Sequence, residues 1–209
     1  MWLNSNYTAC RKEFKIMVIS SSNSYSKSNP DLVSISSANK INLKRFRQNG
    51  QIHIYQSSYR GSYSSIIRDS LRNAALGRKV LLVQFMKGGV QQGISNAIKL
   101  CGNLTWVRST HSFDQYHSEE IVNNRNLINS IHEATNELWN FCKKELLSGE
   151  NDQIILDEIF LAIEMKIIDK DDLISTLENR FISGDVILTG TDIPKDLLLM
   201  ANQITELRS

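Results

Sequence analysis

The sequence predicts an α/β protein in which helices cover both faces of a mainly parallel sheet. Two observations predict this class. Strand and helix patterns alternate from residue 51 to residue 209. The segments 80–85 and 153–156 are largely continuous apolar runs, which is typical of strands buried on both faces of a parallel sheet. Helices that connect parallel strands lie against the faces of the sheet, so both faces are expected to be covered.

In the first half of the chain, three strands are expected, at 51–55, 80–85 and 104–107. The helix after the first strand has apolar residues at three- and four-residue spacing and is expected to end at Gly77, a residue typical of helix termination. A short helix is expected at 96–100.

The second half alternates in the same way. The long helix carries an apolar stripe at helical spacing, and the last helix begins at a proline, a residue favoured in the first turn. The expected strands are 153–156, 185–189 and 204–207, and the expected helices are 119–147, 160–167, 170–179 and 194–201.

Length and composition predict one globular domain behind a basic arm. The chain has 209 residues, of which 41% are hydrophobic and 22% are charged. Residues 1–50 hold 8 Lys or Arg and 2 Asp or Glu, whereas the remainder holds 16 and 20. We therefore expect a basic arm rich in Ser and Asn at 1–46, with Met17 as an alternative start, and an α/β domain at 47–209.

Several functional classes are not favoured. A net charge of +2 gives no support for nucleic-acid binding. No apolar run approaches the ~18 residues that a membrane span needs. The three cysteines have no metal-binding or disulfide spacing, which favours a reducing, cytoplasmic location.

The strand, loop and helix at 54–76 have the arrangement of a phosphate-binding P-loop, G-x-x-x-x-G-K-[ST]. In that motif, glycines bring backbone N–H groups to the phosphates, lysine neutralises them and the hydroxyl binds Mg²⁺. Of these residues only Gly61 is present. Ser62 replaces the lysine and Tyr63 the metal-binding hydroxyl, and Ser57 stands at the start of the loop in place of a glycine.

Two further features bear on this loop. Arg60 precedes the remaining glycine, and its guanidinium offers a bidentate partner for phosphate. Asp157 and Glu158 follow a buried strand, as do the metal-binding carboxylates of P-loop proteins. An acidic pair in such a place is also consistent with a helix cap or a solvated turn, and both interpretations stay open.

Five segments in chain order resemble the P-loop ATP:corrinoid adenosyltransferases. They are 83–88 (VQFMKG), 154–158 (IILDE), 177–180 (LENR), 186–190 (VILTG) and the closing run 196–208. The resemblance covers about residues 47–209. It departs from the family in the loop, at Phe181 in place of proline, and at Thr191 in place of arginine.

The resemblance implies a RecA-like P-loop NTPase fold in a cytoplasmic homodimer of cobalamin metabolism. It implies transfer of the 5′-deoxyadenosyl group of ATP to the Co(I) of a corrinoid, with release of triphosphate and with Mg²⁺ or Mn²⁺ bound. It also implies site residues by position. These are Arg60, Gly61, Ser62 and Ser64 for nucleotide, Asp157 and Glu158 for metal, Gln84, Lys87, Gly88, Thr189 and Gly190 at strand ends, and Phe113 and Tyr116 for the corrinoid pocket.

Two hypotheses about the ligand site follow, and a third is a dimeric scaffold that binds neither ATP nor a corrinoid. The chain is an active or weakly active adenosyltransferase in which Arg60 and Glu158 retain triphosphate and metal. Alternatively, it is an inactive paralogue that has lost its ATP site and acts as a corrinoid-binding or regulatory partner subunit. The replaced loop residues favour the second hypothesis slightly, because each removes an interaction that MgATP needs.

Overall fold

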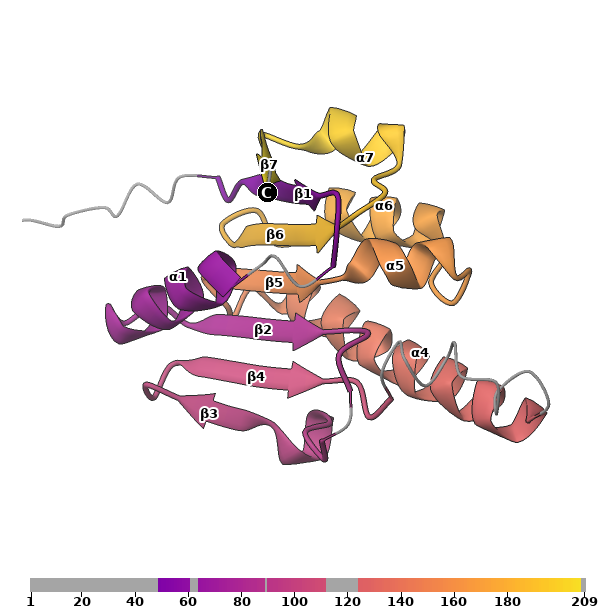
Figure 1. Ribbon diagram of the computed structural model, residues 1–209. Helices are drawn as coiled ribbons and strands as arrows, with labels where there is room; N and C mark the ends of the chain where they lie inside the picture. The colour runs from indigo at the N-terminus through magenta and orange to yellow at the C-terminus, as the bar shows by residue number, and fades with distance from the viewer. Residues whose placement is uncertain (1–48, 61–63, 89, 112–123, 208–209) are drawn as a thin grey trace, which may run out of the picture. The chain divides into compact units, whose positions relative to one another are not determined.

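The computed structural model describes residues 49–60, 64–88, 90–111 and 124–207. Within them, one seven-stranded sheet has the order β3-β4-β2-β5-β6-β1-β7, and every strand pair is parallel except β3 with β4 (Figure 1). The strands are β1 (Ile52–Ser57), β2 (Val80–Gln84), β3 (Ile98–Leu100), β4 (Leu104–Arg108), β5 (Gln153–Asp157), β6 (Asp185–Gly190) and β7 (Gln203–Leu207). The predicted α/β class is therefore confirmed.

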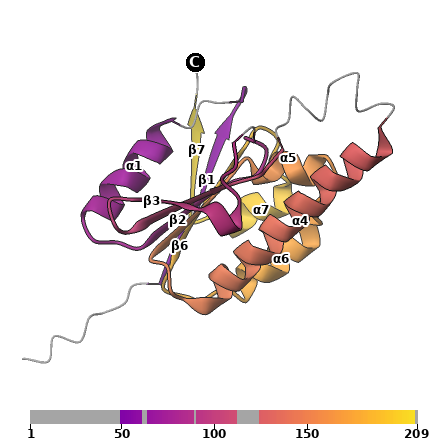
Figure 2. The same ribbon diagram turned by 90° about the horizontal axis from the view of Figure 1, so that it is seen from below.

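Helices cover both faces of this sheet, as the two views show together (Figures 1 and 2). Helix α1 lies on one face, and α4, α5, α6 and α7 lie on the other. The helices are α1 (Ser64–Ala75), a 3₁₀ turn η1 (Ile94–Asn96), α4 (Arg125–Ser148), α5 (Ile159–Glu164), α6 (Lys170–Glu178) and α7 (Lys195–Met200).

Alternate residues of the central strand β2 supply the two halves of the core. Leu81 and Val83 pack in the cluster on the α4 side, whereas Val80 and Leu82 pack with Ile66 of α1. All five residues of β2 are buried, and so are all five of β5. This two-sided burial explains why both strands are apolar along most of their length.

The helix predicted at 96–100 is wrong. Its last three residues form β3, which pairs antiparallel with β4, and only residues 94–96 make a single 3₁₀ turn. The chain reverses through Cys101 and Gly102, which both have positive φ. Glycine tolerates that conformation, and this turn lets a short edge strand pair where a helix would leave the backbone of β4 unpaired.

Gly77 confirms the predicted end of the first helix, and Asp169 and Cys142 have clear structural roles. Gly77, at φ 91°, follows the end of α1, and Asp169 caps α6 by accepting a hydrogen bond from the N–H of Asp171 at 2.9 Å. Cys142 is fully buried in the core, and burial raises the pKa of its thiol well above the ordinary value. The predicted start of the long helix at residue 119 lies outside the described residues. No helix in the described part of the chain is long and apolar enough to cross a membrane.

Candidate functional site

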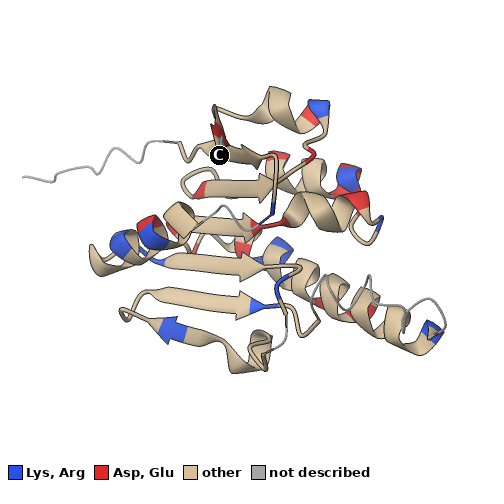
Figure 3. Cartoon of the chain, in the orientation of Figure 1, with Lys and Arg blue, Asp and Glu red and all other residues tan. Residues whose placement is uncertain are grey.

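The carboxyl ends of the parallel strands bring acidic and basic side chains together. Asp157 ends β5 and Glu158 follows it, while Arg60 follows β1 and Lys87 follows β2. Charged segments of both signs meet along this edge of the sheet (Figure 3). Ligands of open parallel sheets bind at this edge, because the loops after neighbouring strands converge there. The described residues of the loops after β1, β2 and β5 meet here.

The carboxylate of Asp157 is buried and accepts hydrogen bonds from three side chains. Its Oδ1 accepts from the hydroxyl of Thr189 at 2.7 Å. Its Oδ2 accepts from Nε2 of Gln84 at 2.6 Å and from Nζ of Lys87 at 2.9 Å. Only 2% of the Asp157 side chain is exposed, so these donors take the place of water around its carboxylate.

Glu158 is held next to it by two cations. Nη2 of Arg60 lies 2.6 Å from Oε2 of Glu158, and Nζ of Lys87 lies 3.6 Å from its Oε1. The same arginine nitrogen lies 3.5 Å from the carbonyl oxygen of Met86. Arg60 and Lys87 therefore converge on one buried carboxylate from two different loops.

The backbone of Glu158 has the left-handed conformation, with φ 61° and ψ 29°. Its N–H donates to the hydroxyl of Thr189 at 2.9 Å, which helps to fix that conformation. A non-glycine residue in this region costs about 1–3 kcal/mol, and such residues cluster at functional sites. The bend turns the chain directly from β5 into α5 and leaves the side chain of Glu158 at the strand ends.

Gln84 connects this cluster to the next strand. Its side-chain oxygen accepts hydrogen bonds from Nε1 of Trp106 at 3.0 Å and from Nε of Arg108 at 2.7 Å. Gln84 pairs in register with both Arg108 and Asp157. The alignment of the three strands therefore brings these three side chains together. Arg108 also lies over the ring of Trp106, 5.0 Å from its centroid. The sequence pattern did not indicate Trp106 or Arg108 as site residues, because register with a neighbouring strand has no local signature.

Thr189 and Gly190 of β6 have distinct roles. Thr189 is fully buried and links the side chain of Asp157 to the backbone of Glu158. Gly190 lies against Phe160 of α5, where an added Cβ would come within 2.6 Å of the Phe160 Cβ. The close approach of β6 to α5 therefore explains why this position is a glycine.

The remaining predicted residues are only partly described. Ser57 is buried at the end of β1, and Ser64 is exposed as the first residue of α1. Gly88 lies in the loop after β2. Five other positions from the sequence analysis lie outside the described residues: Gly61, Ser62, Tyr63, Phe113 and Tyr116.

The divalent metal that the resemblance implies does not fit the described residues well. No group of three or more His, Cys, Asp or Glu in the described ranges is placed to hold a metal ion. Both oxygens of Asp157 accept hydrogen bonds from side chains, and Oε2 of Glu158 is bound by a guanidinium. A metal at this carboxylate pair would first have to displace Arg60 or Lys87.

Arg180, in the segment 177–180, has a structural role. Its Nη1 donates to the carbonyl of Leu177 at 2.7 Å and its Nη2 to that of Gly50 at 3.1 Å. It therefore ties the end of α6 to the segment before β1. Burial lowers the pKa of this guanidinium from its ordinary value.

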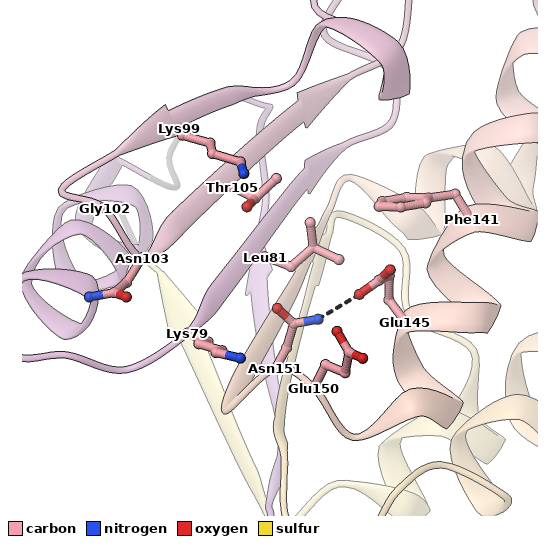
Figure 4. Close-up of a pocket in the computed structure, with 10 residues that line it drawn as sticks. All are labelled: Lys79, Leu81, Lys99, Gly102, Asn103, Thr105, Phe141, Glu145, Glu150 and Asn151. Carbon is pink, nitrogen blue, oxygen red and sulfur yellow. Dashed lines mark hydrogen bonds between the residues drawn. The ribbon is translucent and has the colours of Figure 1, made fainter.

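A pocket of about 340 Å³ lies at the opposite, amino-terminal edge of the sheet (Figure 4). Leu81 and Phe141 line its apolar part, and Asn151 donates a hydrogen bond to Glu145 at 2.7 Å. None of the predicted site residues lines it. It is therefore separate from the charged cluster at the strand ends, where the chemistry-bearing residues gather.

Comparisons with known proteins agree with this arrangement. The model of the family described as ATP:corrinoid adenosyltransferase BtuR/CobO/CobP matches residues 48–209. A corrinoid adenosyltransferase of Escherichia coli K12 is 25% identical over 162 residues, which are 77% of this chain and 78% of that protein. The corrinoid adenosyltransferase CobA of Salmonella typhimurium is 24% identical over 161 residues, 77% of this chain and 78% of that protein.

A third relative, an uncharacterised protein of Nostoc, is 24% identical over 173 residues, or 78% of this chain and 44% of that protein. The family match covers well over half of the chain and includes every described residue of the charged cluster. The chain therefore belongs to the ATP:corrinoid adenosyltransferase BtuR/CobO/CobP family.

Proposed function

We propose that the chain binds ATP at the strand ends and transfers its 5′-deoxyadenosyl group to a reduced corrinoid. One observation carries the proposal. Arg60, from the loop in the P-loop position, and Lys87, from the loop after β2, converge on the same carboxylate. Two cations from separate loops at this edge match the needs of a polyphosphate, because each can form charge-assisted hydrogen bonds to its oxygens.

In the proposed reaction, the electron pair of Co(I) attacks C5′ of ATP. A Co–C bond forms, the C5′–O bond breaks, and its electron pair leaves with the triphosphate. Arg60 and Lys87 would offset charge on this leaving group. A charge-assisted hydrogen bond contributes about 1.5–3 kcal/mol, so the loss of one cation should slow transfer by roughly ten- to a hundredfold.

A single-turnover assay tests the proposal. Purified protein is mixed with ATP and a chemically reduced corrinoid, and formation of the adenosylated product is followed by absorbance. We expect product with the unaltered protein and at least about tenfold slower formation with Arg60→Ala. Arg68→Ala is the matched control, because Arg68 lies on α1 with 78% of its side chain exposed. Equal rates for Arg60→Ala and the unaltered protein would contradict the proposed role of Arg60.

A second candidate function is an inactive paralogue that binds a corrinoid or a partner subunit. The observation that favours it is mutual neutralisation: the two cations of the cluster are bonded to its two acids. Together with Ser62 and Tyr63 in place of the usual lysine and hydroxyl, this leaves fewer groups for MgATP. Absence of product in the assay, with corrinoid binding retained in the absence of ATP, would support this candidate.

A further inference from the structure

The charged cluster at the strand ends contains its own cations at the place where a divalent metal would be expected. Arg60 bonds Oε2 of Glu158 at 2.6 Å, and Lys87 lies 2.9 Å from Asp157 and 3.6 Å from Glu158. Both carboxylates are buried, with 2% and 3% of their side chains exposed. The positive charges of Arg60 and Lys87 thus offset the negative charges of Asp157 and Glu158 within one cluster.

Metal coordination would conflict with this arrangement for two physical reasons. Mg²⁺ binds carboxylate oxygen at about 2.0–2.1 Å and demands near-octahedral geometry. Three of the four carboxylate oxygens here already accept directed bonds, from Gln84, Lys87, Thr189 and Arg60. A divalent ion beside a guanidinium and an ammonium would also be repelled by both. The sequence removes a further ligand, because Tyr63 replaces the hydroxyl that binds the metal in a P-loop.

The two cations are nevertheless accessible to a ligand. The side chains of Arg60 and Lys87 are 32% and 23% exposed, so each has a solvent-facing part although its acidic partner is buried. A guanidinium presents five N–H donors in a fixed fork that matches phosphate oxygens, and an ammonium presents three. Arg60 and Lys87 can therefore each neutralise a buried acid and also contact an anion through the exposed part of the side chain.

We propose that Arg60 and Lys87 take the place of the divalent metal, so that the chain binds the polyphosphate of its nucleotide without Mg²⁺ or Mn²⁺. The nucleotide part of this inference rests on the proposed function. The replacement of the metal rests only on the contacts of the two carboxylates.

Two measurements on the full chain test the inference. The first is titration with Mn²⁺ alone, followed by the electron paramagnetic resonance signal of the free ion. We expect no saturable binding at millimolar Mn²⁺. Saturable binding that disappears in Glu158→Gln would overturn the inference.

The second measurement compares the Kd for ATP in excess EDTA with the Kd in saturating Mg²⁺. We expect values within about threefold of each other, and a loss of at least about tenfold in EDTA for Arg60→Ala but not for Arg68→Ala. Arg60→Lys, which keeps the charge and loses the fork, covers the case in which the alanine variant fails to fold. A tenfold or larger loss of ATP affinity on removal of Mg²⁺ from the unaltered protein would overturn the inference. If ATP binds under neither condition, the proposed function fails, and the Mn²⁺ titration alone decides whether the metal has been replaced.

Discussion

Asp157 and Asp172 accept hydrogen bonds from similar kinds of side chain but lie in different places in the fold. Asp157, at the end of β5, accepts from Lys87 at 2.9 Å and from Gln84 at 2.6 Å. Asp172, in α6, accepts from Lys143 at 2.8 Å and from the indole N–H of Trp139 at 2.7 Å. Each therefore combines one lysine with one neutral N–H donor.

Their surroundings separate the two clusters. The side chain of Asp157 is 2% exposed and lies where the ends of several strands converge. The side chain of Asp172 is 41% exposed and joins only α6 to α4, where Lys143 also lies over the ring of Trp139. Partner chemistry alone therefore does not distinguish a site from a contact that joins two helices. Burial and the convergence of loops from distant parts of the sequence do.

The largest effect that this comparison predicts comes from Asp157→Ala. This change leaves Lys87, Gln84 and Thr189 without their shared acceptor in a buried place, which should cost about 3–5 kcal/mol of the free energy of unfolding. Urea denaturation followed by circular dichroism measures it, with Asp172→Ala as the exposed counterpart. Equal losses for the two variants would contradict the distinction drawn between the clusters.

Gly190→Ala should have an intermediate effect. The new Cβ would come within 2.6 Å of the Phe160 Cβ, and overpacking of this kind typically costs about 1–3 kcal/mol. Gly93→Ala is the control, because the nearest atom to its added Cβ is a methyl group of Thr110 at 3.8 Å. Thermal or urea unfolding of both variants checks this, and a stability of Gly190→Ala equal to that of the control would show that α5 and β6 can separate freely.

Asp172→Asn should have the smallest effect, below about 1 kcal/mol, because the pair is partly exposed and screened by solvent. Burial on its own would raise the pKa of Asp172, but hydrogen bonds from Lys143 and Trp139 outweigh it and lower the pKa below its ordinary value. A lowered carboxyl pKa stabilises the fold above the unfolded pKa, about 3.9, and this contribution disappears as the pH falls through the folded value.

Urea titrations at several pH values test this sign. The stability difference between the unaltered protein and Asp172→Asn should be largest near neutral pH and should shrink as the pH falls into the acidic range. A difference that grows on acidification would contradict the lowered pKa of Asp172.

The sequence predicted the elements whose signals are local. Each of these signals lies within one short stretch of the chain. The apolar runs predicted β2 and β5, the apolar stripe predicted α4, and the acidic pair directly follows β5. The parallel class followed from their alternation. Because the strands are parallel, the loops that contain Arg60, Lys87 and Glu158 meet at one edge of the sheet.

Features that depend on neighbours in space could not be predicted in the same way. The three residues of β3 form a strand because β4 offers an unpaired edge. Their own sequence, a lysine between two apolar residues, is too short to identify a strand. Arg108 joins the cluster because β4 aligns it with Gln84, which no spacing along the chain indicates. The role of Gly190 similarly depends on Phe160, which belongs to a different element.

The most direct test of the central claim, that the strand-end cluster is a ligand site and the helix cluster is not, is calorimetric titration with ATP. We predict measurable binding by the unaltered protein, at least about tenfold weaker binding by Arg60→Ala, and unchanged affinity in Asp172→Asn. No heat at millimolar ATP, or equal affinities for Arg60→Ala and the unaltered protein, would contradict the claim that Arg60 and its carboxylate partner form a nucleotide site.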